Sequence, residues 1–219
     1  RDLHPRVRRQ LQMCIRDRGG TIDFVTRIVT PDIGSDKVTY DYKYNDAGNT
    51  INFVIGFGLV INNVNFPDWE FRNYVQNDVK DINGKRVGED KILTTDEITA
   101  VKEIKMYREM ISSLNGIEYF TSLTKLVCSL NEYLTTLDVS KCKELEALYC
   151  NYNALTSLNI NGCSKLTEIE CYGNNLTVLD FSEFTNLEKL NCSSNKNLES
   201  LALGNCTKLT TLNCSSTNL

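Results

Sequence analysis

Nine cysteines are the residues of this chain whose types and spacing could carry chemistry. They could form disulfides or hold a metal, but no C-x-x-C pair occurs, so a zinc ribbon is not supported. One set of these cysteines recurs every 21 or 22 residues along the chain. A second set recurs at the same interval, except that Phe184 replaces the cysteine in one copy. Because a position that accepts Phe is an apolar packing position, we expect reduced cysteines stacked in a core. The two sets are Cys128, Cys150, Cys171, Cys192 and Cys214, and Cys142, Cys163 and Cys206.

Other catalytic groups are sparse. The single histidine, His4, lies in the arginine-rich start of the chain, which disfavours His-based nucleophilic catalysis and most His-containing metal sites. Glu168 and Glu170 are adjacent outward carboxylates on a predicted strand, but no cleft signal accompanies them. With no nucleophile elbow or phosphate loop either, we do not expect an enzyme.

The cysteine spacing belongs to a longer internal repeat of 21 or 22 residues. Each copy reads LxxLxCxxN and then LxxLxVSxC or a close variant, with copies starting at Leu123, Leu145, Leu166, Leu187 and Leu209. Self-similarity at this period predicts a solenoid in which stacked repeats bury one continuous core. A disguised first copy is predicted from Val101, with a single amphipathic helix over 96–114 as the alternative. The last copy stops in mid-repeat, so we expect a longer solenoid.

These repeats resemble the leucine-rich-repeat family, in the short internalin-like form of bacterial surface proteins. The resemblance implies that the asparagines after each cysteine form a ladder whose amides turn the chain out of the strand. The second half of each repeat reads like the first, which predicts extended segments on both faces of a flattened coil. The ladder residues are Asn131, Asn153, Asn174 and Asn195.

The predicted fold class is α+β, mostly β: a leucine-rich-repeat solenoid over 101–219 with an N-terminal helical cap, preceded by a small β-rich segment. Residues 1–20 resemble translated sequencing-adapter read-through and are predicted to be non-native or disordered; a basic targeting or nucleic-acid arm is the alternative. Residues 21–65 are rich in β-forming types, with clear alternation from Val38 to Tyr44. Over 66–100 we predict the cap, starting with a helix that has Pro67 at its first position.

The resemblance also implies a calcium loop, of the EF-hand or dockerin type, within the cap. The ligand types that remain are Asp81, Asn83, Asp90 and Glu97. The loop is degenerate, because counting back twelve positions from Glu97 places Arg86 at the first ligand position and Lys91 at the turn glycine. Glu97 could instead close a capping box with Thr94. We therefore expect no cofactor, with calcium as the open alternative.

Strand alternation predicts one outward face on the main sheet, and this face is the candidate binding site. We expect Tyr107, Tyr149 and Tyr172 to lie in register on it. Its candidate residues are Lys105, Tyr107, Lys125, Val127, Tyr149, Tyr152, Glu168, Glu170, Tyr172, Lys189 and Asn191.

The predicted function is a non-catalytic binding module of a bacterial cell-surface or secreted protein, acting on a protein or glycan. The alternative is a structural spacer of a larger surface protein. A formal net charge of −4 argues against a nucleic-acid partner, and no apolar run is long enough to cross a membrane. We expect a monomer.

Overall fold

The computed structural model describes residues 37–43, 50–56, 59–88 and 91–219. The chain divides into two compact units, residues 1–58 and 59–219. In the first unit, β1 (Lys37–Lys43) and β2 (Thr50–Gly56) pair antiparallel, with Lys43 opposite Thr50. Strand β1 covers most of the stretch in which alternation was predicted. The segment 1–20 and its alternatives lie outside the described residues.

The second unit starts with two short helices and a two-stranded sheet. Strand β3 (Leu59–Val60) pairs antiparallel with β4 (Ile92–Leu93), and helices α2 (Trp69–Asn77) and α3 (Thr95–Ala100) follow β3 and β4. Helix α2 begins after Asp68, whose Oδ1 accepts the N–H of Phe71 at 2.8 Å. The N-cap is therefore Asp68, and Pro67 lies just outside the helix rather than at its first position.

Asp68 also joins helix α2 to the first coil of the solenoid. Its Oδ2 accepts the backbone N–H of Ser112 at 2.9 Å, the Ser112 hydroxyl at 2.7 Å and the N–H of Ser113 at 3.2 Å. Burial alone would raise the pKa of Asp68, but these bonds and that from Phe71 outweigh it and hold the pKa below the usual value. The side chains of Phe66, Phe71 and Val75 continue the core of the coils. That this segment is needed as a cap stays a prediction.

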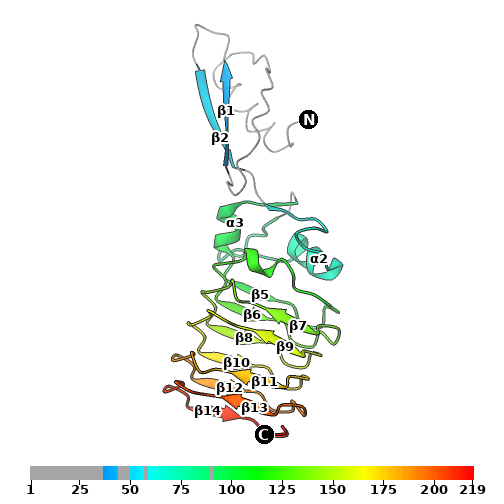
Figure 1. Cartoon of the computed structure of the whole chain (residues 1–219). Coiled ribbons are helices and arrows are strands. Elements are labelled where there is room, and N and C mark those ends of the chain that lie inside the picture. Colours follow the sequence, from blue (N-terminus) through cyan, green and yellow to red (C-terminus); the bar gives the residue numbers. More distant parts are fainter. Residues whose placement is uncertain (1–36, 44–49, 57–58, 89–90) are drawn as a thin grey trace. The chain divides into compact units, whose positions relative to one another are not determined.

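The solenoid is built on a six-stranded parallel sheet, here called the repeat sheet (Figure 1). Every copy of the repeat contributes one strand, including the disguised first copy. The strands are β5 (Glu103–Lys105), β6 (Lys125–Val127), β8 (Ala147–Tyr149), β10 (Glu168–Glu170), β12 (Lys189–Asn191) and β14 (Thr211–Asn213). The alternative prediction of a single helix over 96–114 is therefore wrong, because α3 ends at Ala100 and Ile104 pairs with Leu126.

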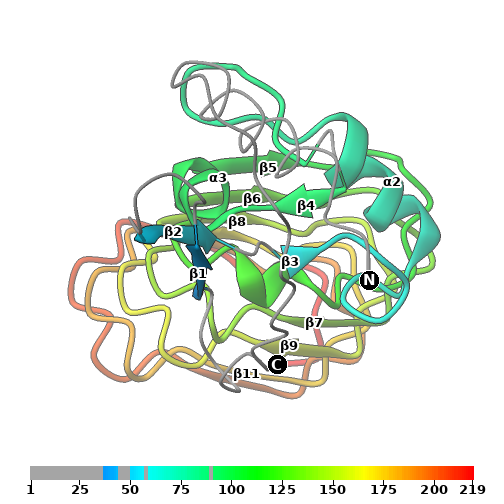
Figure 2. The ribbon, with the colours of Figure 1, turned by 90° about the horizontal axis from the view of Figure 1, so that it is seen from above.

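The return segments of the coils are extended, as predicted from the likeness of the two half-repeats. Strand β7 (Thr136–Asp138) pairs with β9 (Ser157–Asn159), and β11 (Val178–Asp180) with β13 (Ser200–Ala202), all parallel. Only the first coil differs, with a 3-10 turn, η1 (Ile117–Tyr119). Seen along the stack, β5, β6 and β8 lie on one side of the coil and β7, β9 and β11 on the other (Figure 2).

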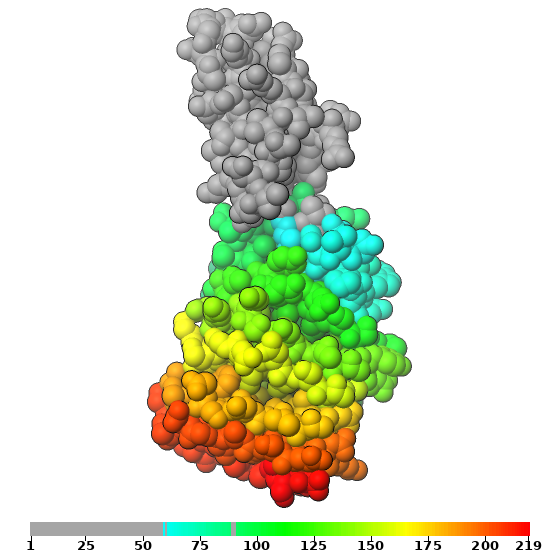
Figure 3. All heavy atoms as spheres, viewed as in Figure 1, coloured from blue at the N-terminus to red at the C-terminus, as the bar shows by residue number. Residues whose placement is uncertain are grey.

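A single apolar core runs through this unit from Ile61 to Leu198. In the space-filling view the coils form successive bands in chain order (Figure 3). All eight cysteines of the described region are free thiols, and six of them are buried. Burial raises the pKa of Cys128 and Cys142 to about 12, so these thiols stay protonated. The cysteines thus pack as small apolar side chains, as their shared positions predicted.

The asparagine ladder is present and fully bonded. In each of the four coils that carry a ladder asparagine, the side-chain amide donates to the cysteine carbonyl of its own coil and to the equivalent carbonyl of the coil before. For Asn174 these bonds reach Cys171 O at 2.9 Å and Cys150 O at 3.0 Å, and its Oδ1 accepts the N–H of Leu155 at 3.0 Å. At Thr217, where the ladder ends, a hydroxyl donates to Cys214 O instead.

The residue before each ladder position has a left-handed backbone. It is Arg108, Leu130, Tyr152, Gly173, Ser194 and Ser216 in successive coils, with φ between 54° and 67°. Only one of the six is glycine, although this region disfavours other residues. The turn that leads the chain away from the repeat sheet is therefore fixed by the coil, and the ladder amide stabilises the backbone that follows it.

We predict that Asn174→Ala lowers the free energy of unfolding by about 2–3 kcal/mol, because it leaves the buried N–H of Leu155 without an acceptor. Urea unfolding followed by circular dichroism measures this. The matched control is Asn175→Ala, whose exposed side chain should cost less than about 0.5 kcal/mol. Equal losses for the two variants would contradict the role given to the ladder.

Candidate functional site

The outward side chains of the repeat sheet are arranged in three rows that cross the strands. The middle residue of the first five strands, such as Leu148 or Ile169, is buried, so its two neighbours face outward. The first row is Glu103, Lys125, Ala147, Glu168, Lys189 and Thr211, and the second is Lys105, Val127, Tyr149, Glu170, Asn191 and Asn213. A third row, two residues further along each coil, is Tyr107, Ser129, Asn151, Tyr172, Ser193 and Ser215.

The predicted register of three tyrosines is wrong for one of them. Tyr107 and Tyr172 share the third row, but Tyr149 lies in the second, between Val127 and Glu170. The cause lies in the repeat itself, because Tyr149 precedes the buried cysteine of its coil whereas the other two follow the equivalent residue. The three tyrosines still face the same side, offset by one row.

Two tyrosines of neighbouring coils pack against each other at the edge of this face. The rings of Tyr152 and Tyr172 are 4.9 Å apart between centroids and nearly perpendicular, at 79°. Tyr152 has a left-handed backbone, and its ring lies over Gly173, where a Cβ would come within 2.7 Å of it. Glycine at this place in the next coil thus makes room for the ring, and Tyr152 stays 52% exposed.

Small polar residues lie between the aromatic ones in the third row. Ser129 and Asn151 are buried, and the Ser129 hydroxyl donates to Asn151 Oδ1 at 2.7 Å. Strand alternation alone would place both side chains at the surface. Tyr107 is 53% exposed, and desolvation, helped by Glu170, Tyr152 and Tyr107, raises the pKa of Tyr172. The row therefore presents tyrosines at both ends of a small, internally bonded polar stretch.

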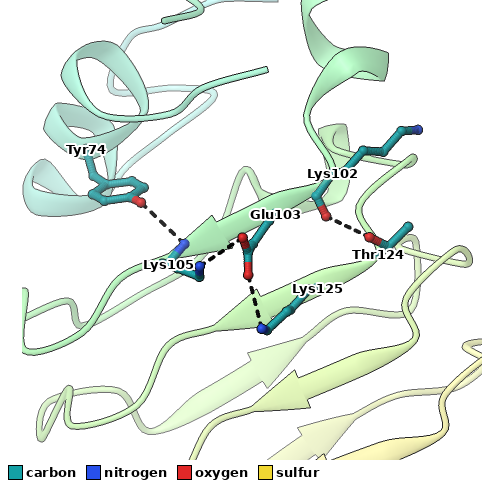
Figure 4. Close-up of polar contacts among 6 residues, drawn as sticks. All are labelled: Tyr74, Lys102, Glu103, Lys105, Thr124 and Lys125. Atoms are coloured by element: carbon teal, nitrogen blue, oxygen red, sulfur yellow. Dashed lines mark hydrogen bonds and ion pairs between the residues drawn. The ribbon is translucent and has the colours of Figure 1, made fainter. Parts of the chain in front are cut away.

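Most charges on this face are neutralised within it. Glu103 accepts from Lys105 at 2.9 Å and from Lys125 at 3.2 Å (Figure 4), and Glu168 is 3.7 Å from Lys189. Desolvation, helped by the neighbouring carboxylates of Glu168 and Glu170, raises the pKa of Tyr149 to about 12. These pairs are largely exposed, so each stabilises the fold only weakly.

The remaining predicted binding residues lie on the same face. Lys125 Nζ is 5.5 Å from the centroid of the Tyr149 ring, and half-buried Val127 lies beside that tyrosine. The Oδ1 of Asn191 accepts the N–H of Ser193 at 3.2 Å and its hydroxyl at 2.8 Å, so its amide is partly engaged. The structure thus brings the predicted residues together, and their role in binding stays a prediction.

A groove beside the repeat sheet was not anticipated from the sequence. It has a volume of about 550 Å³ and lies between helix α2, the loop after it and strand β5. At its wall the Tyr74 hydroxyl accepts the N–H of Lys105 at 3.3 Å, as Figure 4 shows. It is lined by Tyr74, Asp78, Lys80, Asp81, Ile82, Gly84, Lys102, Glu103 and Lys105. Nothing in the sequence pattern indicates that these segments meet.

The predicted calcium ligands are used in local turns and caps. Asp81 Oδ1 accepts the N–H groups of Asn83 at 2.8 Å and Lys85 at 2.9 Å. Glu97 Oε2 accepts from the Thr94 N–H at 2.9 Å and hydroxyl at 2.8 Å, which forms the predicted capping box. Asn83 is exposed, and Asp90 lies outside the described residues. Over the residues described, no group of three or more His, Cys, Asp or Glu side chains could hold a metal ion.

A family model, the endo-beta-N-acetylglucosaminidase EndoS LRR domain, matches residues 66–195. The chain belongs to this leucine-rich-repeat family. The matched range covers helix α2 and most coils of the EndoS-type solenoid, including all four ladder asparagines. No curated protein matches the chain in sequence.

Two solved structures are similar to this EndoS-type chain. The functional domain of InlJ from Listeria monocytogenes, described as including a cysteine ladder, is 28% identical with a TM-score of 0.54. An internalin, InlF, from L. monocytogenes strain 4b F2365 is 24% identical with a TM-score of 0.58, which supports the fold alone. The matches cover 74% and 73% of this chain but only 39% and 46% of the two structures. The internalin-like form of the repeats is thereby confirmed.

We predict that calcium leaves the melting temperature unchanged. The first ligand position of the loop is held by Arg86, whose positive side chain cannot bind calcium, and Glu97 already accepts hydrogen bonds from Thr94. Thermal unfolding with 1 mM EDTA and then with about 1 mM calcium, a concentration at which weak extracellular sites fill, measures this. A rise in melting temperature with calcium that Glu97→Gln removes would contradict the prediction and establish the site.

Proposed function

We propose that this chain is a non-catalytic binding module of a bacterial cell-surface or secreted protein, which recognises a protein or glycan through the outer face of the repeat sheet. One observation carries the proposal: the exposed Tyr107 and Tyr152 and the half-buried Tyr149 and Tyr172 gather on an open face built by six successive coils. Tyrosine is enriched in interface cores because it offers a large rigid surface with one polar end.

The chemistry of the face supports recognition rather than catalysis. Glu168 lies 3.7 Å from Lys189, and this ion pair disfavours a role of its carboxylate as a general acid. The thiols of the ladders are mostly buried with raised pKa values, which disfavours the thiolate that a nucleophile requires. Binding by shape and multiple contacts is the function that such an open surface supports best.

The proposed location rests on the similar structures. Both come from Listeria and one is called an internalin, and internalins are bacterial surface or secreted proteins. In the parts of the chain that the structure describes, no helix has both the length and the apolar character to cross a membrane. We extend the bacterial surface or secreted location to this chain as part of the proposal.

We predict that the triple variant Tyr107→Ala, Tyr152→Ala, Tyr172→Ala loses partner binding at least about 100-fold, because aromatic anchors dominate interface energetics. The wild-type protein is first screened against arrays of extracellular proteins and of glycans, and each hit is then measured by surface plasmon resonance with the variant.

The matched control is Tyr133→Ala, since Tyr133 is as exposed as Tyr152, at 52%, but lies outside the three rows. It should leave binding within about two-fold of wild type. Unchanged binding by the triple variant would show that the repeat sheet is not the recognition surface. That result would favour the alternative of a structural spacer.

A further inference from the structure

One carboxylate of the repeat sheet is not paired with a cation. Glu170, on strand β10 in the second row, forms no ion pair with any residue of the described region. Lys189 on the neighbouring strand forms its ion pair with Glu168 instead. Partial burial and the charge of Glu168 raise the pKa of Glu170, against a smaller opposing effect of Lys189. Glu170 is thus a half-buried negative charge that the fold does not neutralise.

Aromatic rings border this carboxylate on two sides. Tyr149 lies directly opposite Glu170 on strand β8, and Tyr172 follows it by two residues on the same face. Tyr152 packs against Tyr172 at 4.9 Å and extends the aromatic border. The Tyr149 ring already has a cation 5.5 Å from its centroid, Lys125 Nζ, so this surface accepts positive charge over its rings.

A carboxylate between aromatic rings has the chemistry of a site for a planar cation. A guanidinium can bond to the carboxylate with two parallel N–H groups and stack on a tyrosine face at the same time. A lysine ammonium can form the ion pair but has no planar face to stack. A neutral glycan could donate hydroxyl hydrogen bonds to Glu170 but brings no positive charge to pair with it, and an acidic glycan would be repelled.

We propose, building on the proposed function, that Glu170, Tyr149 and Tyr172 bind an arginine side chain of a protein partner. The assignment selects a protein over a glycan and places an arginine at the centre of the interface. The exposed ring of Tyr152, which packs on Tyr172, then lies at the border of that contact and shields it from water.

The test uses two synthetic peptides that differ only in charge. Acetyl-Gly-Arg-Gly-Arg-Gly-amide and its citrulline twin are titrated into the chain, and tyrosine ring resonances are followed by NMR. We expect the arginine peptide to shift the resonances of Tyr149 and Tyr172 and the uncharged twin to leave them unchanged. Glu170→Gln should weaken the binding of the arginine peptide by about five-fold or more, since it removes a partly buried charge pair.

Glu199→Gln is the control, because it removes the same charge from an exposed carboxylate next to strand β13, on the opposite sheet. It should change the affinity by less than about two-fold, as long-range attraction is screened by salt. Equal weakening by both variants, or binding of the citrulline twin at the same affinity, would overturn the arginine assignment. If the arginine assignment fails in this way but the tyrosine triple variant still loses its partner, the proposed binding function stands without the arginine assignment.

Discussion

The structure depends on satisfying buried backbone groups at the place where each coil leaves the repeat sheet. Stacked coils bury this turn, so its N–H and C=O groups lose water and must find partners in the protein. An asparagine amide supplies them, reaching Cys150 O and Cys171 O in the case of Asn174 and accepting the N–H of Leu155. The carbonyls of Cys128, Cys150 and Cys171 are each shared by the amides of two coils, so these coils are joined by polar bonds as well as by the apolar core.

The same stacking creates the surface on which function is proposed. Because every coil repeats the same turn, outward residues from distant parts of the sequence are aligned one strand spacing apart. Tyr107 and Tyr172 come from coils separated by two others, yet they share one row. The ladder thus determines the register, and the register determines which charges meet. Glu103 and Glu168 face lysines across the strands, whereas Glu170 faces Tyr149 and Asn191.

Features that recur in every coil could be predicted from the sequence, and features that belong to one coil could not. The strands, the buried cysteines and the ladder asparagines follow from positions that many copies confirm together. The packing of Tyr152 on Tyr172 requires a left-handed backbone at Tyr152 and a glycine in the next coil, a coincidence of two single residues. Burial of Ser129 depends on a bond to Asn151, which alternation alone does not reveal. The groove beside helix α2 arises from contacts between separate segments, for which the sequence has no periodic signal.

Radical footprinting of the tyrosines, with and without a captured partner, tests the central claim most directly, namely that the repeat sheet is the recognition surface. Mass spectrometry reports the oxidation of each ring separately. The account predicts that Tyr107, Tyr152 and Tyr172 are protected when the partner is bound, and that Tyr133, which is equally exposed but outside the rows, is oxidised as before. Protection of Tyr133 alone, with the three sheet tyrosines oxidised at their free rate, would contradict it.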